Sequence, residues 1–194
     1  MSFSKWIFLS ISIPMTGLAI AVGSNIKSLA VRAPDGTVAF EAGLLLVNTS
    51  TTFNGVRVRQ AKYYFDLELP ADIGEPLQKV VIQQRKGGDE VEFKPEKTQV
   101  YLGDRRNKGE RIGAIAKVNN SASENKTAAE IIIQFKRSIS PGNKITIGLK
   151  PKQNPKYPGV YLFGVTAFPR GEKARGMYLG AGRLHFYRND GARF

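Results

Sequence analysis

The chain has no cysteine and a single histidine among its 194 residues. Without cysteine there is no disulfide and no thiol nucleophile, so burial of apolar side chains must hold the fold together. One histidine cannot build a zinc site, which needs several His or Cys ligands. That residue, His185, shares the polar side of an expected strand with Arg183 and Tyr187, and nothing around it suggests a Ser-His-acid triad. These absences predict a protein that is not an enzyme and that carries no metal and no cofactor.

Outside the N-terminus the sequence has no apolar run long enough to cross a bilayer as a helix. The N-terminus places Lys5 ahead of an uncharged stretch that ends in the small-x-small pattern Ala19-Ile20-Ala21. This pattern predicts a cleaved secretory signal peptide over residues 1–21, and the alternative is an uncleaved anchor reaching about residue 26. Cleavage would remove Lys5 and lower the formal net charge from +13 to +12. The sequence therefore predicts export to the periplasm, the outer envelope or the extracellular space.

Acidic residues are scarce, with 16 Asp and Glu against 29 Lys and Arg, and the sequence pI is about 10.0. In a cytosolic protein this balance would suggest nucleic acid as a partner. Outside the cytoplasm the available polyanions are acidic polysaccharides, lipid headgroups and acidic protein surfaces, so nucleic acid is not expected. The alternative is a solvated surface with a cationic bias and no fixed partner.

Short segments with apolar residues at every second position follow one another along the chain, separated by turn residues. Such a succession, without a long helical pattern, is typical of a β-sandwich. We expect a single all-β sandwich, immunoglobulin-like or Greek-key, over residues 30–188, followed by a C-terminal tail at 189–194. Its roughly nine strands are expected near residues 38–40, 63–69, 79–84, 90–93, 99–102, 112–119, 130–136, 144–150 and 160–168.

Residues 130–136 and 144–150 are expected to pair as a β-hairpin across Pro141-Gly142. Proline fixes φ at the first central position of a type II turn, and glycine accepts positive φ at the second. The isoleucines and the phenylalanine at 131, 133 and 135 would share one face of this hairpin, as would the apolar residues at 145, 147 and 149.

Side-chain patterns also make predictions about three other segments. Tyr64, Asp66 and Glu68 are expected to form the solvent-exposed face of their strand. Gly87 and Gly88 are expected to supply positive φ in the turn between 79–84 and 90–93. The polar stretch 120–129 is expected to be the least ordered interior segment.

The run GVYLFGVTAFP, residues 159–169, carries no charge and has apolar residues on both faces of a strand. It is too short to cross a membrane as a helix, and Pro158 and Pro169 bound it. The pattern predicts a central core strand buried on both sides. Gly164 is expected to allow a bulge or a close backbone contact.

Four phrases in a fixed order, YYFDLELP, GEPLQKVVIQQ, NPKYPGVYLFGVTAFPRG and GAGRLHFY, resemble an uncharacterised cyanobacterial family of exported proteins, domain of unknown function 2808. The resemblance runs from about residue 30 to residue 187. It implies a cyanobacterial source and an envelope or secreted location. It brings no established activity, cofactor or catalytic residue.

The residues best suited to binding are cationic side chains interleaved with aromatic ones in the C-terminal third. Such side chains suit sugars, phosphates and lipid headgroups. A second basic group lies in the loop before residue 112, and the alternative for both groups is a solvated loop or an arginine-guarded edge strand. The candidate binding residues are Arg170, Lys173, Arg175, Arg183, His185, Tyr187 and Arg188 in the first group and Arg105, Arg106 and Lys108 in the second.

The leading hypothesis is an exported, non-enzymatic domain that binds an anionic envelope component through these basic residues. One alternative is a structural or assembly protein that docks on another exported protein by a sheet edge. A more remote alternative is a glycan-active enzyme, which would need two carboxylates at glycosidase separation in one groove.

Overall fold

Backbone hydrogen bonds arrange the chain into two antiparallel sheets of five strands each, in a computed structural model that describes residues 33–119 and 130–188. The first, here the β10 sheet, has the order β12 (Met177–Phe186), β10 (Gly159–Pro169), β4 (Leu77–Lys86), β8 (Glu130–Ile139) and β7 (Ala114–Asn119). The second, here the β3 sheet, has the order β2 (Leu45–Thr51), β3 (Tyr63–Glu68), β9 (Lys144–Leu149), β5 (Gln99–Leu102) and β6 (Arg111–Ile112).

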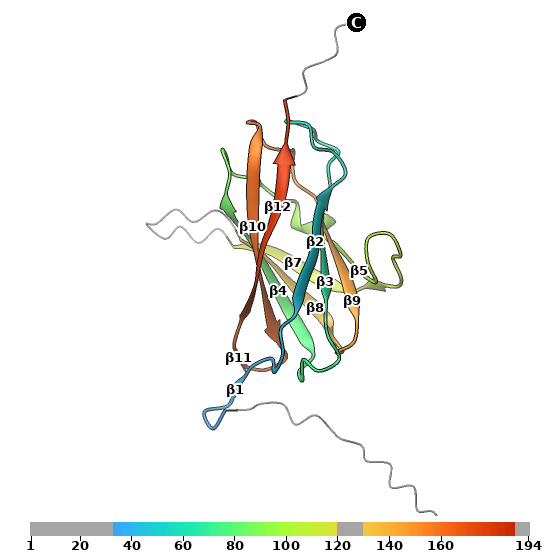
Figure 1. Cartoon of the computed structure of the whole chain (residues 1–194), viewed down its shortest axis with the longest axis vertical. Coiled ribbons are helices and arrows are strands. Elements are labelled where there is room, and N and C mark those ends of the chain that lie inside the picture. Colours follow the sequence, from blue (N-terminus) through green and yellow to red (C-terminus); the bar gives the residue numbers. More distant parts are fainter. Residues whose placement is uncertain (1–32, 120–129, 189–194) are drawn as a thin grey trace, which may run out of the picture.

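The two sheets face each other as a β-sandwich, which confirms the predicted fold class (Figure 1). Two further strands, β1 (Thr37–Val38) and β11 (Lys173–Ala174), pair in parallel at one end of the sandwich. A 3-10 turn, η1 (Pro95–Lys97), precedes β5. Within the described residues there is no helix long and apolar enough to cross a membrane. The predicted signal peptide, the polar stretch 120–129 and the C-terminal tail lie outside the described residues.

The core between the sheets is rich in aromatic rings. The centroid of the Tyr63 ring lies 5.8 Å from that of Phe93 and 5.6 Å from that of Phe186. Phe163, from the opposite sheet, packs edge-on against Phe65 at 6.1 Å. Full burial of each such ring stabilises the fold by about 1.5–3 kcal/mol, so this cluster is a main source of stability in a protein without disulfides.

The uncharged run 159–169 forms β10, which lies between β12 and β4. Its inward side chains, including Tyr161 and Phe163, are fully buried, as the core-strand prediction required. The expectation of burial on both sides is wrong for the outer face, where Leu162 and Phe168 are half-buried. Among the described residues no second layer of strands covers the outer face of this sheet, and its apolar residues are partly exposed.

The expected hairpin between residues 130 and 150 does not form. β8 pairs with β4 and β7, whereas β9 pairs with β3 and β5 of the other sheet. The turn crosses between sheets, Gly142 has the predicted positive φ of 79°, and its amide donates to the carbonyl of Leu69 at 2.8 Å. The faces were predicted correctly, because both apolar rows point into the core: Ile131, Ile133 and Phe135 from one sheet and Ile145, Ile147 and Leu149 from the other.

Residues 90–93 do not form the expected strand, although Phe93 makes an isolated bridge to Pro151. The side chain of Gln84 takes the place of a ladder here: its Oε1 accepts from the amide of Val91 at 2.8 Å, and its Nε2 donates to the carbonyl of Asp89 at 2.7 Å. The predicted positive φ at Gly87 and Gly88 is also wrong. Gly87 is needed for space, since a Cβ there would lie 2.3 Å from the Tyr161 ring.

Two edge strands, β12 and β2, lie side by side and close one side of the sandwich (Figure 1). The contact depends on Gly182, because a Cβ at that position would lie 2.2 Å from the hydroxyl of Thr49. Beyond it, the amide of Tyr187 donates to the carbonyl of Asn54, and the amide of Val56 donates to that of Tyr187. The two edges are therefore covered by each other.

Replacing Gly182 with alanine should reduce the free energy of unfolding by about 1–3 kcal/mol, because the methyl group overpacks this contact. Denaturation in urea measures the change. Gly43→Ala is the matched control, since no atom lies within 4 Å of a Cβ at that position. Equal stability of the two variants would contradict the packing described for β12 and β2.

Candidate functional site

The C-terminal group of predicted binding residues does not form one surface. Arg170, Lys173 and Arg175 lie at the β1–β11 end of the sandwich, where the ammonium of Lys173 donates to the carbonyl of Asp35 at 2.9 Å. Arg183 and His185 lie near the opposite end of β12, roughly 25–33 Å from Arg175 at the usual rise of a strand. Tyr187 and Arg188 follow β12 at that far end, and their side chains are exposed.

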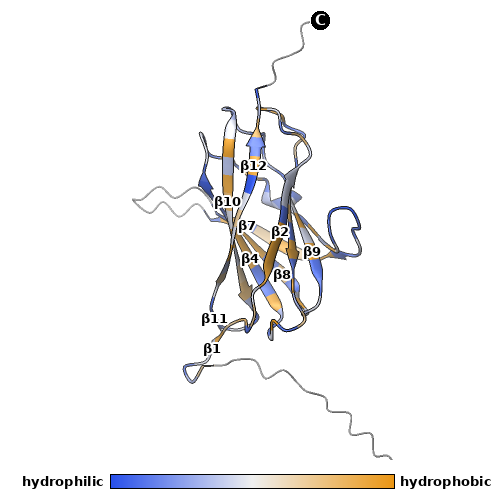
Figure 2. Cartoon of the chain, viewed as in Figure 1, coloured by the Kyte–Doolittle hydropathy of each residue, from blue (hydrophilic) through white to orange (hydrophobic). Residues whose placement is uncertain are grey.

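The second predicted group does lie together, in the loop between β5 and β6. This loop is hydrophilic and borders the β3 sheet (Figure 2). The guanidinium of Arg105 and the ammonium of Lys108 lie 4.9 Å and 4.6 Å from the centroid of the Tyr64 ring. Arg105 Nη1 also donates to the hydroxyl of Ser50 at 2.9 Å, while Arg106 is exposed. Two of these three residues therefore fix the loop to the sheet.

The prediction that this face of β3 is exposed to solvent is wrong for two of its three residues. Tyr64 is covered by the loop and Asp66 is only 6% exposed. The Asp66 carboxylate accepts hydrogen bonds from the hydroxyl of Thr146 at 2.7 Å and from the side-chain amide of Asn48 at 3.0 Å. Of the three predicted residues, Glu68 remains partly exposed and pairs with Lys144 at 3.1 Å. Around Asp66 the outer side of the β3 sheet is thus occupied by its own polar contacts, whereas Leu45 and Val47 of β2 are 54% and 57% exposed.

The two sheets differ sharply in charge. The strands of the β3 sheet contain two basic residues, Lys144 and Arg111, and two acidic ones. The strands of the β10 sheet contain seven basic residues and one acidic residue, Glu130, whose carboxylate accepts a hydrogen bond from Asn119. Five of the seven alternate with core residues and so lie on the outer side of the sheet, which we call the basic face: Lys79, Arg85, Lys117, Lys136 and Arg183.

Aromatic rings lie beside the charges of the basic face. The ammonium of Lys79 lies 4.0 Å from the centroid of Phe168, and the guanidinium of Arg85 lies 6.0 Å from that of Tyr178, which is 55% exposed. Gly164 makes room for this arrangement, because a Cβ there would lie 2.9 Å from Nε of Arg85. The close neighbours of Gly164 are side chains of Arg85 and Tyr178 and not backbone, and the register of β10 against β12 shifts next to it, between Val165 and Thr166. Cationic groups held beside partly exposed rings can bind anionic groups and apolar surface together.

Most of the basic face was not predicted from the sequence. Of its five residues, only Arg183 was among the predicted binding residues. The available signal was the alternation within β4, where Lys79 and Arg85 share a phase opposite to that of Val80 and Ile82. That signal could be interpreted only with the pairing of β4, β8 and β7, which brings Lys117 onto the same face.

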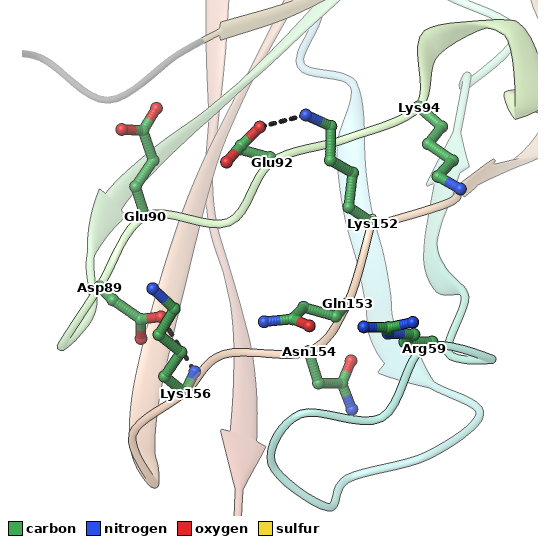
Figure 3. A pocket seen from close by; sticks show the side chains of 9 residues that line it. All are labelled: Arg59, Asp89, Glu90, Glu92, Lys94, Lys152, Gln153, Asn154 and Lys156. Atoms are coloured by element: carbon green, nitrogen blue, oxygen red, sulfur yellow. Dashed lines mark hydrogen bonds and ion pairs between the residues drawn. The ribbon is translucent and has the colours of Figure 1, made fainter.

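An open pocket of about 620 Å³ lies at the end of the sandwich where β10 begins (Figure 3). Its walls come from three connections, β2–β3, β4–β5 and β9–β10. The lining is charged with both signs, and in Figure 3 the Gln153 amide points into the space between the acidic segment 89–92 and Arg59. The lining residues are Arg59, Asp89, Glu90, Glu92, Lys94, Lys152, Gln153, Asn154 and Lys156.

The carboxylates of the pocket have partners in the protein. Asp89 accepts hydrogen bonds from the Tyr161 hydroxyl and from the backbone amide of Lys156, and Glu92 pairs with Lys152. Burial, with the hydrogen bond to Asp89 and its charge, raises the pKa of Tyr161 to about 12. Within the described residues no group of His, Cys, Asp and Glu could hold a metal ion.

A family model described as Protein of unknown function (DUF2808) matches residues 37–186. The chain belongs to this family. The match agrees with the resemblance noted in the sequence, and it covers both five-stranded sheets of the DUF2808 chain.

No curated protein matches this DUF2808 chain. Among solved structures, it is similar to the collagen-binding domain of a Staphylococcus aureus adhesin, with 10% identity, 73% of this chain and 98% of that chain covered, and a TM-score of 0.37. It is also similar to the collagen-binding subdomain of the Enterococcus faecalis surface protein ACE (6% identity, 71% and 95% covered, TM-score 0.40). A third similar structure is a cohesin module of a Clostridium perfringens family 33 glycoside hydrolase (11% identity, 73% and 96% covered, TM-score 0.34).

The raised pKa of Tyr161 predicts a loss of stability at alkaline pH. Unfolded tyrosine ionises near pH 10, whereas Tyr161 stays protonated in the fold up to about pH 12, so unfolding releases a proton in this range and the free energy of unfolding falls as the pH rises. Tyr161→Phe should make that slope less negative by up to about 1.4 kcal/mol per pH unit. Urea denaturation between pH 9.5 and 12 measures it, and an unchanged slope in the variant would contradict the assignment.

Proposed function

We propose that this protein is an exported, non-enzymatic binding domain whose basic face binds an anionic partner of the cell envelope. The observation that carries the proposal is the charge of the β10 sheet, seven basic residues against one acidic residue, beside a β3 sheet with two of each. The proposed binding surface is thus the outer side of one sheet, whereas the residues expected from the sequence lie mostly in loops.

The spacing of the charges supports a cooperative electrostatic surface. Strands lie about 4.8 Å apart, so the basic face from β12 to β7 is roughly 19 Å wide. The Debye length at 0.1 M salt is about 10 Å, so neighbouring charges on this face reinforce one another at moderate ionic strength. An extended polyanion can contact several of them at once, whereas a single small anion cannot.

Apolar groups between the charges support the same proposal. Val81 and Ile132 lie partly exposed in the middle of the face, and Ile115 at its β7 edge is 52% exposed. A sugar ring, an acyl chain near its headgroup or an acidic protein could each cover such groups while its anionic groups meet the lysines and arginines. The partner is therefore expected to bury apolar surface as well as neutralise charge.

A sheet edge is the second candidate. Among the described residues β7 has a single strand neighbour, β8, and it exposes Ile115. An added strand would bind through backbone hydrogen bonds and apolar contacts, which salt weakens little. Binding that persists in high salt would favour this assembly role over the charged face.

The proposal is tested by a variant that removes two charges from the basic face, Lys79→Gln with Lys117→Gln. Exposed charge pairs are each worth up to about 1 kcal/mol, so the double variant should bind immobilised alginate, or vesicles containing phosphatidylglycerol, about fivefold to tenfold more weakly at low salt. Retention of the wild type should fall steeply as salt rises.

Arg106→Gln with Arg111→Gln is the charge-matched control, because both residues belong to the other sheet and its loop. This control should bind almost as well as the wild type. Equal weakening of both double variants would show that net charge alone acts, and retention unaffected by salt would contradict the charged face altogether.

A further inference from the structure

The end pocket is built differently from the basic face. Its acidic residues lie on one segment, 89–92, and Lys94 follows them on the same connection, while Arg59, Lys152 and Lys156 come from the two other connections. Asp89 and Glu92 are engaged as described above, whereas the charged ends of Arg59, Lys94 and Lys156 make no hydrogen bond or ion pair with any described residue. The cationic side of the pocket is therefore available to an added anionic group.

More positive charge lies directly behind Lys94. Its backbone amide donates to the carbonyl of Lys150 at 2.8 Å, and the ammonium of Lys150 donates to the carbonyls of Arg59 and Ala61. The next residue after Ala61 is Lys62, so three lysines converge on adjoining segments. Partial burial, together with the charges of Lys94 and Lys62, lowers the pKa of Lys150, as expected where cations are crowded without a counter-ion.

The acidic segment 89–92 favours a different kind of ligand group. Carboxylates accept hydrogen bonds, so the segment 89–92 suits hydroxyl donors and repels an anion placed against it. Gln153 adds an amide that can both donate and accept, and no hydrogen bond to a described residue occupies it. A volume of about 620 Å³ is in the range of small-ligand sites. The ligand that satisfies both walls carries hydroxyl groups at one side and a carboxylate at the other.

We infer that the pocket binds an acidic sugar unit, with its carboxylate on Arg59 and Lys94 and its hydroxyls against Gln153 and the segment 89–92. This site is distinct from the basic face, and it does not depend on the face binding anything. Charge-assisted bonds to two cations fix the orientation of the carboxylate, while the acidic wall disfavours a bare inorganic anion.

The test is a titration of the isotope-labelled full chain with glucuronate, followed by the NMR signals of the Gln153 side-chain amide and of residues 152–156. Glucuronate should shift these signals with a dissociation constant of about 1–10 mM, the range expected for a small ligand held by a few polar contacts. Glucose, which lacks the carboxylate, should leave them in place. Inorganic phosphate should bind at least about fivefold more weakly than glucuronate, because the acidic segment repels its charge and it offers fewer hydroxyl donors than a sugar.

Two variants separate the roles of the walls. Arg59→Gln with Lys94→Gln should weaken glucuronate about tenfold, while the charge-matched Arg106→Gln with Arg111→Gln should not change it. Gln153→Ala should weaken glucuronate about threefold and leave phosphate unchanged. The variant of the basic face, Lys79→Gln with Lys117→Gln, should leave this titration unchanged, so a failure of either proposal is visible without the other.

Three results would overturn the inference. Pocket signals that stay in place with glucuronate at about 50 mM would exclude the site. Equal weakening by the pocket variant and by its control would mean that the response reports net charge. Phosphate binding as strongly as glucuronate would show an anion site without sugar recognition.

Discussion

The hydrogen bond from the Tyr63 hydroxyl to Oδ1 of Asn154, 3.0 Å long, connects the aromatic core to the end of the sandwich that carries the pocket. Tyr63 is completely buried, and a buried hydroxyl without a partner would cost several kcal/mol, roughly 2–7 by transfer measurements. Asn154 supplies the partner, and its Nδ2 donates to the carbonyls of Phe53 and Gly55 at 2.9 Å and 2.7 Å. One side chain thus holds the core ring, the β2–β3 connection and the β9–β10 connection in a fixed relation.

The outer sides of the two sheets differ in how many of their polar side chains bind one another. The β3 sheet uses its outer side internally, since Asp66, Thr146 and Asn48 satisfy one another and Arg105 fixes a loop over Tyr64. No described segment covers the outer side of the β10 sheet in this way, and its cations lie beside half-buried apolar residues. Electrostatic attraction acts over about a Debye length, whereas the hydrophobic effect requires direct contact. Such a face can therefore attract an anionic partner first and then bury apolar surface against it. The pocket at the end of the sandwich adds a smaller site with walls of opposite charge.

The sequence predicted which residues face the core far better than it predicted which strands pair. Ile131 and Ile147 are both buried as expected, yet they belong to different sheets. Period-two patterns report the face of a strand, and both a hairpin and a crossing between sheets bury the same apolar rows, so the pattern cannot distinguish them. The failure at residues 90–93 has another cause, since Gln84 supplies through its side chain the bonds that a strand would have made.

The candidate site was predictable only in part for a similar reason. Arg105, Arg106 and Lys108 are neighbours in sequence and remain neighbours in space, whereas Arg175 and Arg183 are separated by most of β12. Lys79 and Lys117 are brought to one face by strand pairing across β8, which no local pattern contains. The pocket depends likewise on three connections that are distant in sequence.

Lysine footprinting of the wild-type protein would show whether the outer side of the β10 sheet is the binding surface. The protein would be acetylated with and without an excess of alginate, and the modification of each lysine would be quantified by mass spectrometry. We predict that Lys79, Lys117 and Lys136 become protected while Lys108 and Lys144, which belong to the β3 sheet and its loop, react as before. Protection spread evenly over all lysines, or confined to those of the β3 sheet, would contradict this prediction.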